Sequence, residues 1–235
     1  MFCKKKKEKF RQNNFIVVDD FNDVKKFFGF SKEPIMVEND LDTIDSFSDF
    51  NGRKIKDSTI LATFAANVTP GKMLDIGTFY GRSAASMSVN SPNSTIYTVN
   101  ILPEQVENNA GAFTTEFLTK DQIGIYYKER NLKNIKQIYA NTKTWKVEEE
   151  INDLSLVFID GCHDEEFVYS DTKLILDRVK KGGFILWHDF SPYYRSNFIW
   201  INDSMKGVEK LMKEKLISAY VINVRGSWIG IWRKE

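Results

Sequence analysis

Short apolar runs alternate with helical segments from about residue 56 onward, and this alternation constrains the fold more than any other feature of the sequence. One run, Leu154–Ile159, is apolar almost throughout, which is typical of a strand covered by helices on both faces. Strands separated by helices predict a Rossmann-like, doubly wound α/β fold with a mostly parallel sheet. The expected strands are Met73–Gly77, Thr95–Val99, Ile135–Tyr139, Leu154–Ile159 and Phe184–Trp187. The expected helices are Thr59–Val68, Arg82–Val89, Glu165–Val179 and Asp203–Lys215, with one or two more between Pro103 and Arg130, broken near Phe113.

The last two apolar runs, Ala219–Val224 and Ser227–Trp232, flank Arg225-Gly226 and so predict an antiparallel hairpin. Together with the five earlier strands they give a seven-stranded sheet. A chain of 235 residues is long enough for one such domain, which we expect to span residues 56–235. Residues 1–55 lack the alternation, and we expect a helical or irregular extension or lid there. Phenylalanines between residues 21 and 30 indicate one short amphipathic helix within it.

The charge balance and the cysteines limit the partners and the compartment. The chain has 33 basic and 32 acidic residues, so nothing in the composition favours nucleic acid as a partner. No apolar stretch is long enough to span a bilayer. The two cysteines, Cys3 and Cys162, are far apart and have no metal-ligand spacing, which fits a reduced, cytoplasmic setting. A homodimer is compatible with these features.

Two glycines, Gly77 and Gly81, bracket the turn between the first expected strand and its helix. Glycine allows a ligand to approach the backbone, and the start of a helix offers free N–H groups to an anion. Asp75 adds a carboxylate for a cationic ammonium. The turn therefore suits the amino-acid end of S-adenosylmethionine (SAM), although a plain strand-turn-helix connection has the same pattern. The G-x-G-x-x-G pattern of dinucleotide-binding folds is absent, which argues against NAD.

The segment from Asp75 to Ala84, with Gly77-x-x-x-Gly81-x-Ser83-Ala84, resembles the cofactor loop of the catechol-type and macrolide-sugar O-methyltransferases. Asp160-Gly161-x-His163, then Gly182-Gly183 and His188-Asp189, are similar to the same group of class I enzymes. The resemblance implies that the methionine end of SAM contacts Asp75, Gly77, Thr78, Phe79, Gly81 and Ser83. It implies that Asn100 and Ile101 meet the ribose and adenine, that Asn141 and Thr142 flank the adenine, and that Gly161 packs near it. The family usually has an acidic residue at the position of Asn100, so we expect weaker binding or a substitute such as Glu104.

A second group of polar residues follows two neighbouring strands: Asp160 and His163 after one, His188 and Asp189 after the other. The carboxyl ends of parallel strands meet at one edge of a sheet, so these side chains should lie together. The resemblance implies a divalent metal at Asp160, His188 and Asp189. Because magnesium prefers oxygen ligands and imidazole suits softer metals, the ion could be Mg²⁺, a softer metal or absent. The matching position in the sugar O-methyltransferases carries a histidine base, which makes His163 the expected catalytic base beside Asp160, at an ordinary pKa of about 6.5.

These observations predict a SAM-dependent methyltransferase that acts on a hydroxyl of a small molecule, such as a sugar, a phenol or a natural product. An N-methyltransferase, a nicotinamide-dependent oxidoreductase and a non-catalytic SAM-binding module are the alternatives. Aromatic residues after the last parallel strand could line the acceptor pocket or form a packed rim: Trp187, Tyr193, Tyr194, Phe198 and Trp200.

Overall fold

The computed structural model describes residues 11–12, 15–37, 56–106, 115–218 and 220–235. Its centre is a nine-stranded sheet with the order β1-β2-β8-β9-β7-β6-β3-β4-β5. The strands are β1 (Arg11–Gln12), β2 (Phe15–Val18), β3 (Lys72–Ile76), β4 (Thr95–Asn100), β5 (Ile135–Tyr139), β6 (Leu154–Ile159), β7 (Val179–Trp187), β8 (Val221–Val224) and β9 (Gly230–Arg233). The five strands β7-β6-β3-β4-β5 are parallel, and β8 and β9 form the expected antiparallel pair, with β9 inserted beside β7.

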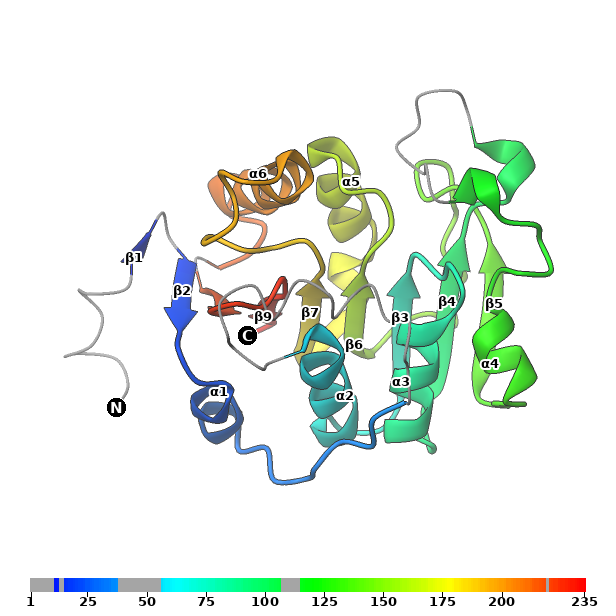
Figure 1. Ribbon diagram of the computed structural model, residues 1–235, viewed down its shortest axis with the longest axis horizontal. Coiled ribbons are helices and arrows are strands. Elements are labelled where there is room, and N and C mark those ends of the chain that lie inside the picture. Colours follow the sequence, from blue (N-terminus) through cyan, green and yellow to red (C-terminus); the bar gives the residue numbers. More distant parts are fainter. Residues whose placement is uncertain (1–10, 13–14, 38–55, 107–114, 219) are drawn as a thin grey trace.

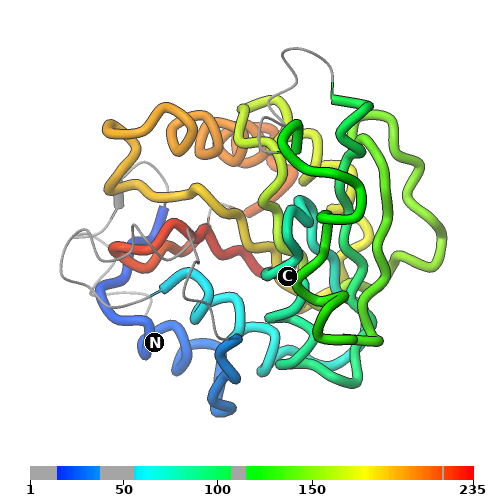
Figure 2. The backbone as a smooth tube through the Cα atoms, turned by 45° about the vertical axis from the view of Figure 1, so that its right-hand side comes forward, coloured from blue at the N-terminus to red at the C-terminus, as the bar shows by residue number. Residues whose placement is uncertain are grey.

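Helices cover both faces of the sheet, which explains why β6 is buried at every position. Figures 1 and 2 show α5 (Glu165–Ile175) and α6 (Ile199–Lys213) side by side on one face. The other face carries α1 (Phe21–Phe28), α2 (Asp57–Asn67) and α3 (Arg82–Asn90). Each face has its own apolar core, because alternate residues of a strand point to opposite sides: Leu74 and Val157 pack toward α5 and α6, whereas Met73 and Phe158 pack toward α2 and α3.

The N-terminal segment adds two strands to the seven that the sequence predicts. The helix expected from the phenylalanines is present as α1, and Asp20 caps it by accepting from the backbone N–H of Asn22 at 2.9 Å. The segment before it was expected to be helical or irregular, but it forms β2, which pairs in parallel with β8. Four residues are too few for a periodicity to reveal this strand, and its stability depends on β8, more than 200 positions away.

The connection between β4 and β5 also differs from the expectation of long helices. Its described parts contain two short 3-10 turns, η2 (Pro103–Gln105) and η3 (Thr115–Phe117), and one short helix, α4 (Ile125–Glu129). The expected break at Phe113 and the cysteine Cys3 lie outside the described residues. Within the described part of the chain, every helix is too short or too polar to cross a membrane.

Candidate functional site

The strand register brings the predicted site residues to one edge of the sheet. Ile76 of β3 lies opposite Ile159 of β6, and Ile159 lies opposite Trp187 of β7. The residues that follow these three, Gly77, Asp160 and His188, are therefore level with one another. The backbone continues the alignment, since Asp160 N–H donates to the Ile76 carbonyl at 2.8 Å and His188 N–H to the Ile159 carbonyl at 3.0 Å. This edge is where α/β sheets bind ligands, beyond the carboxyl ends of the strands at the point where the strand order reverses.

A pocket opens at this edge between the loops that follow β3, β4, β5 and β6. Eight of the residues predicted for the cofactor or the chemistry line it: Gly77, Phe79, Asn100, Ile101, Asn141, Thr142, Asp160 and Gly161. Further lining residues are Ile76, Val99, Thr115, Ala140, Cys162, Phe167 and Asp171. Burial raises the pKa of the Cys162 thiol to about 12, so this cysteine is a packing group and no nucleophile at neutral pH.

Asp75 does not reach the pocket but anchors the loop beside it. It is fully buried, and the Thr98 hydroxyl donates to its Oδ2 atom at 2.6 Å. The network continues through Thr78, whose Oγ1 atom lies 2.7 Å from Thr98 Oγ1 and accepts from Gln137 Nε2 at 3.0 Å. Burial raises the pKa of the Asp75 carboxyl to about 7, although the hydrogen bonds from Thr98 and Ser83 lower it in part. The buried side chains of Asp75, Thr78 and Ser83 are thus placed to stabilise the turn between Gly77 and Gly81.

The two glycines of the turn have conformations that other residues rarely adopt, with φ of 105° at Gly77 and 87° at Gly81. A Cβ atom at Gly77 would lie 2.0 Å from the Asp160 carbonyl oxygen, and one at Gly81 would lie 2.5 Å from the Tyr127 ring. The sequence-based argument was that these glycines leave room for a ligand. In the structure, contacts with neighbouring protein atoms already require glycine at both positions.

We expect Gly77→Ala to lower the free energy of unfolding by at least about 2 kcal/mol, because it combines a strained φ with a backbone clash. Gly71→Ala is the matched control, since its Cβ atom would meet nothing within 4 Å. Urea denaturation of both variants measures the difference. Equal stability of the two variants would show that the turn can move away from Asp160.

Asn100 uses its amide within the protein. Its Oδ1 atom accepts from the backbone N–H of Phe79 at 3.0 Å, and its Nδ2 atom donates to the Ile101 carbonyl at 2.8 Å. The amide therefore ties the glycine turn to the end of β4, a role that a carboxylate could fill only in part because it cannot donate. Glu104, the substitute considered from the sequence, is exposed in η2 and is not among the described residues that line the pocket.

The four predicted catalytic and metal-binding residues form one cluster next to the pocket. His163 Nε2 lies 3.4 Å from Asp160 Oδ1, and His163 Nδ1 lies 3.0 Å from Asp189 Oδ2. His188 Nδ1 faces the same two carboxylates, at 3.1 Å from Asp160 and 3.3 Å from Asp189. Asp189 has a left-handed φ of 50°, an unfavourable conformation for a residue with a side chain and one that often occurs at functional sites.

The charges of the cluster stabilise one another. Burial by itself would lower the pKa of both histidines, but the carboxylates outweigh it: Asp189 and Asp160 raise the pKa of His163 to about 10, and that of His188 is well above its usual range. The histidines in turn outweigh the burial of the carboxyls and hold the pKa of Asp160 and Asp189 below the usual range. The expected pKa of about 6.5 for His163 is therefore wrong for the cluster as it stands.

Asp57 is a member of this site that the sequence analysis missed. It is the first residue of α2, it is 2% exposed, and its Oδ2 atom lies 3.5 Å from His188 Nε2. Its Oδ1 atom accepts from the backbone N–H of Trp228 at 2.9 Å. An acidic residue in the first turn of a helix is usually a favourable dipole contact at the surface, so its sequence position gave no signal.

The aromatic residues at the end of β7 and in the segment that follows it divide between core and surface. Trp187 was considered for the acceptor pocket, but it is fully buried and donates from Nε1 to Thr172 Oγ1 at 2.8 Å. Tyr194 and Phe198 pack around Trp228, whose ring centre lies 6.4 Å from that of His188. Tyr193 and Trp200 are exposed.

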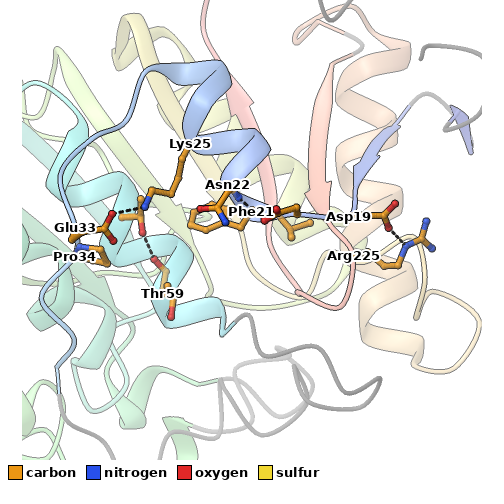
Figure 3. Close-up of a pocket in the computed structure, with 11 residues that line it drawn as sticks. Asp19, Phe21, Asn22, Lys25, Glu33, Pro34, Thr59 and Arg225 are labelled. Atoms are coloured by element: carbon orange, nitrogen blue, oxygen red, sulfur yellow. Dashed lines mark hydrogen bonds and ion pairs between the residues drawn. The ribbon is translucent and has the colours of Figure 1, made fainter. Parts of the chain in front are cut away.

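A second cavity, of about 430 Å³, lies between α1, α2 and the turn after β8. Figure 3 shows its charged groups in pairs, Lys25 with Glu33 and Asp19 with Arg225, both at 2.7 Å. It holds none of the predicted site residues.

Comparison with known proteins places this geometry in a class. Residues 74–190 match the model of a family described as "Methyltransferase domain". The chain shares its fold with the S-adenosylhomocysteine-bound methyltransferase PaMTH1 of Podospora anserina (TM-score 0.52, 16% identity, covering 92% of this chain and 95% of that one). The chain also shares this fold with a precorrin-6y C5,15-methyltransferase of Geobacter metallireducens (TM-score 0.50, 16% identity, covering 76% of this chain and 87% of that one). Residues 74–190 are therefore a methyltransferase domain with the class I fold, as the resemblance implied.

Two further relatives are less complete matches. An O-methyltransferase family protein of Burkholderia thailandensis has a TM-score of 0.51 and 14% identity, covering 73% of this chain and 52% of that one. An uncharacterised protein of Acanthamoeba polyphaga mimivirus, R132, is 25% identical over 142 residues, 60% of this chain. The match spans only 59% of that curated relative's length.

Proposed function

We propose that the protein is a SAM-dependent O-methyltransferase that transfers a methyl group to a hydroxyl of a small molecule, with the help of a divalent cation. One observation supports this above the others: Asp160 lines the pocket at the strand ends and also belongs to the cluster with His163, His188 and Asp189. The groups that could handle an acceptor proton thus adjoin the place proposed for the methyl donor. Methyl transfer needs this arrangement, because the donor is already reactive and the protein must mainly align the acceptor and take its proton.

The pocket has the chemistry that SAM requires. It joins apolar side chains, such as Val99, Ile101 and Phe167, with polar groups at strand ends. Phe79, whose side chain is 37% exposed, stands at its rim. Bound SAM would supply the activated methyl group, and the residues around it would hold its nucleoside and exclude water.

The cluster also fits a divalent cation. One ligand atom each from Asp160, His163 and Asp189 lie within 4.8 Å of one another, and His188 Nδ1 faces both carboxylates. A mixed set of carboxylate and imidazole ligands suits Mn²⁺, Fe²⁺, Ni²⁺ or Zn²⁺ better than Mg²⁺. Such an ion would hold the acceptor oxygen and lower its pKa.

His163 is the proposed base, and its neighbours set a condition on that role. At neutral pH the cluster without a cation keeps His163 protonated, because two carboxylates face its ring nitrogens. It becomes able to accept a proton once Asp160 and Asp189 are neutralised by another positive charge. Asp57, which faces His188 Nε2, then serves to orient His188 within the cluster.

The test is the transfer of labelled methyl groups from SAM to a panel of sugars, phenols and amines, before and after chelation. We expect labelling of hydroxyl acceptors that chelation abolishes and one of the divalent ions restores. Labelling of amines alone would favour an N-methyltransferase. Binding of SAM without turnover on any acceptor would favour a non-catalytic module. The cytoplasmic location and the homodimer stay predictions from the sequence.

A further inference from the structure

The pocket is also lined by Asp171, a carboxylate in the middle of α5 that lies outside the histidine cluster. Its side chain is 1% exposed and lines the pocket together with Thr142, Gly161 and Phe167. The Thr142 side chain hydrogen-bonds to it, and a side chain at Gly161 would come within 3.6 Å of Asp171 Oδ2. Its Oδ1 atom is buried and has no hydrogen-bond partner among the described residues. A buried carboxylate oxygen without a donor is costly, so its presence requires a reason.

The surroundings of Asp171 give no structural reason for a charge at this position. Asp171 lies seven residues into α5, beyond the first turn, where the helix dipole would favour an acid. The nearby cation is Lys143, whose ammonium group lies 4.0 Å from the centre of the Phe167 ring. An asparagine or a serine would fill the same space at a lower cost of desolvation. A ligand that brings its own hydrogen-bond donor would account for the carboxylate.

Resting on the proposed function, we propose that Asp171 recognises the adenine of SAM by accepting a hydrogen bond from its exocyclic amino group on the free Oδ1 atom. The loop after β5, with Asn141 and Thr142, and the ring of Phe167 border the same part of the pocket and would hold the faces and edge of the base. An adenine presents an N–H donor where hypoxanthine presents a carbonyl oxygen. A carboxylate at this point therefore accepts from the first and repels the second.

The experiment compares the binding of S-adenosylhomocysteine with that of S-inosylhomocysteine, which differs by this one group. Titration calorimetry with the full chain at pH 8, above the pKa of about 7 to which burial raises the Asp171 carboxyl, gives both dissociation constants for the unmodified protein, for Asp171→Asn and for Asp164→Asn. Asp164 is an exposed residue just before the same helix and serves as the matched control. We expect the unmodified protein and the control to prefer the adenine compound by at least about 100-fold, because a site built to hydrogen-bond an N–H rejects a ligand without it. In Asp171→Asn the preference should fall to a few-fold, since an amide can donate to the hypoxanthine oxygen.

An unchanged preference in Asp171→Asn, or an equal loss of affinity for both ligands, would overturn the inference; the second result would place a ribose hydroxyl at this carboxylate. The proposed function fails separately, if the unmodified protein binds neither ligand. Folding is not at risk in this variant. Burial raises the pKa of the Asp171 carboxyl to about 7, so its contribution to stability is present at low pH and lost as pH rises through 7. At pH 8 the asparagine should therefore raise the melting temperature.

Discussion

Replacing His163 with alanine should lower turnover by about 10²–10⁴-fold and leave the affinity for SAM unchanged, because the imidazole belongs to the cluster and does not line the nucleoside pocket. The turnover of the unmodified enzyme should rise with pH, with a slope of one proton, up to the pKa of His163. Without a cation that pKa is about 10. A cation on Asp160 and Asp189 neutralises the charges that raise it, so the midpoint of the metal-loaded enzyme should lie well below pH 10.

The control for this variant is Asp164→Asn, next in the chain but outside the cluster, which should keep the turnover of the parent. His163→Gln keeps a polar side chain between the two carboxylates and guards against a general disturbance of the site. The metal affinity of His163→Ala distinguishes a catalytic base from a ligand of the ion. If His163→Ala loses turnover and metal binding together, His163 is a ligand of the ion and the proton goes elsewhere. If it keeps turnover across pH 6 to 9, the base assignment is wrong.

Binding of Mn²⁺ or Ni²⁺ should tighten steeply as pH rises from about 6.5 to 8.5, because an ion held by Asp160, His188 and Asp189 must displace the proton of His188, and its charge favours loss of the proton of His163. The facing carboxylates outweigh the burial of both histidines, raising the pKa of His163 to about 10 and that of His188 well above its usual range. Each proton released strengthens apparent binding by about tenfold per pH unit. Calorimetry in two buffers of different ionisation enthalpy counts the protons directly.

Asp189→Asn is the informative variant for this prediction. It removes one ligand and also one of the two charges that hold the protons, so both the affinity and its dependence on pH should decrease. Glu166→Gln removes an exposed carboxylate of α5 that pairs with Lys210 and should change neither. Metal binding that is independent of pH, or equal in Asp189→Asn and the unmodified protein, would contradict the proposed site.

The sequence predicted the core of the fold because that core depends on local patterns. The parallel strands β3, β6 and β7 each carry an apolar run that ends in a turn, and those runs could be found one at a time. The strand β2 could not be found in this way, since four residues gain their strand conformation by pairing with β8 at the other end of the chain. The connection from β4 to β5 was predicted to be largely helical, whereas its described parts contain only short turns and α4.

The residues of the candidate site also differ in whether local patterns could reveal them. Asp160, His188 and Asp189 follow strands whose neighbours could be deduced, so their proximity was predictable. Asp57 and Asp171 come from helices, and only the packing of those helices on the sheet brings their carboxylates to the site. The raised pKa of His163 was missed for a related reason: the sequence placed Asp189 at the same edge but not within 3.0 Å of the imidazole.

The central claim is that this chain binds SAM at the strand ends, and titration of the full chain with S-adenosylhomocysteine tests it most directly. The prediction is saturable binding at one site, weakened in Gly77→Ala and unaffected in Gly71→Ala, with no binding of NAD under the same conditions. Saturable binding of NAD together with no response to S-adenosylhomocysteine would contradict it.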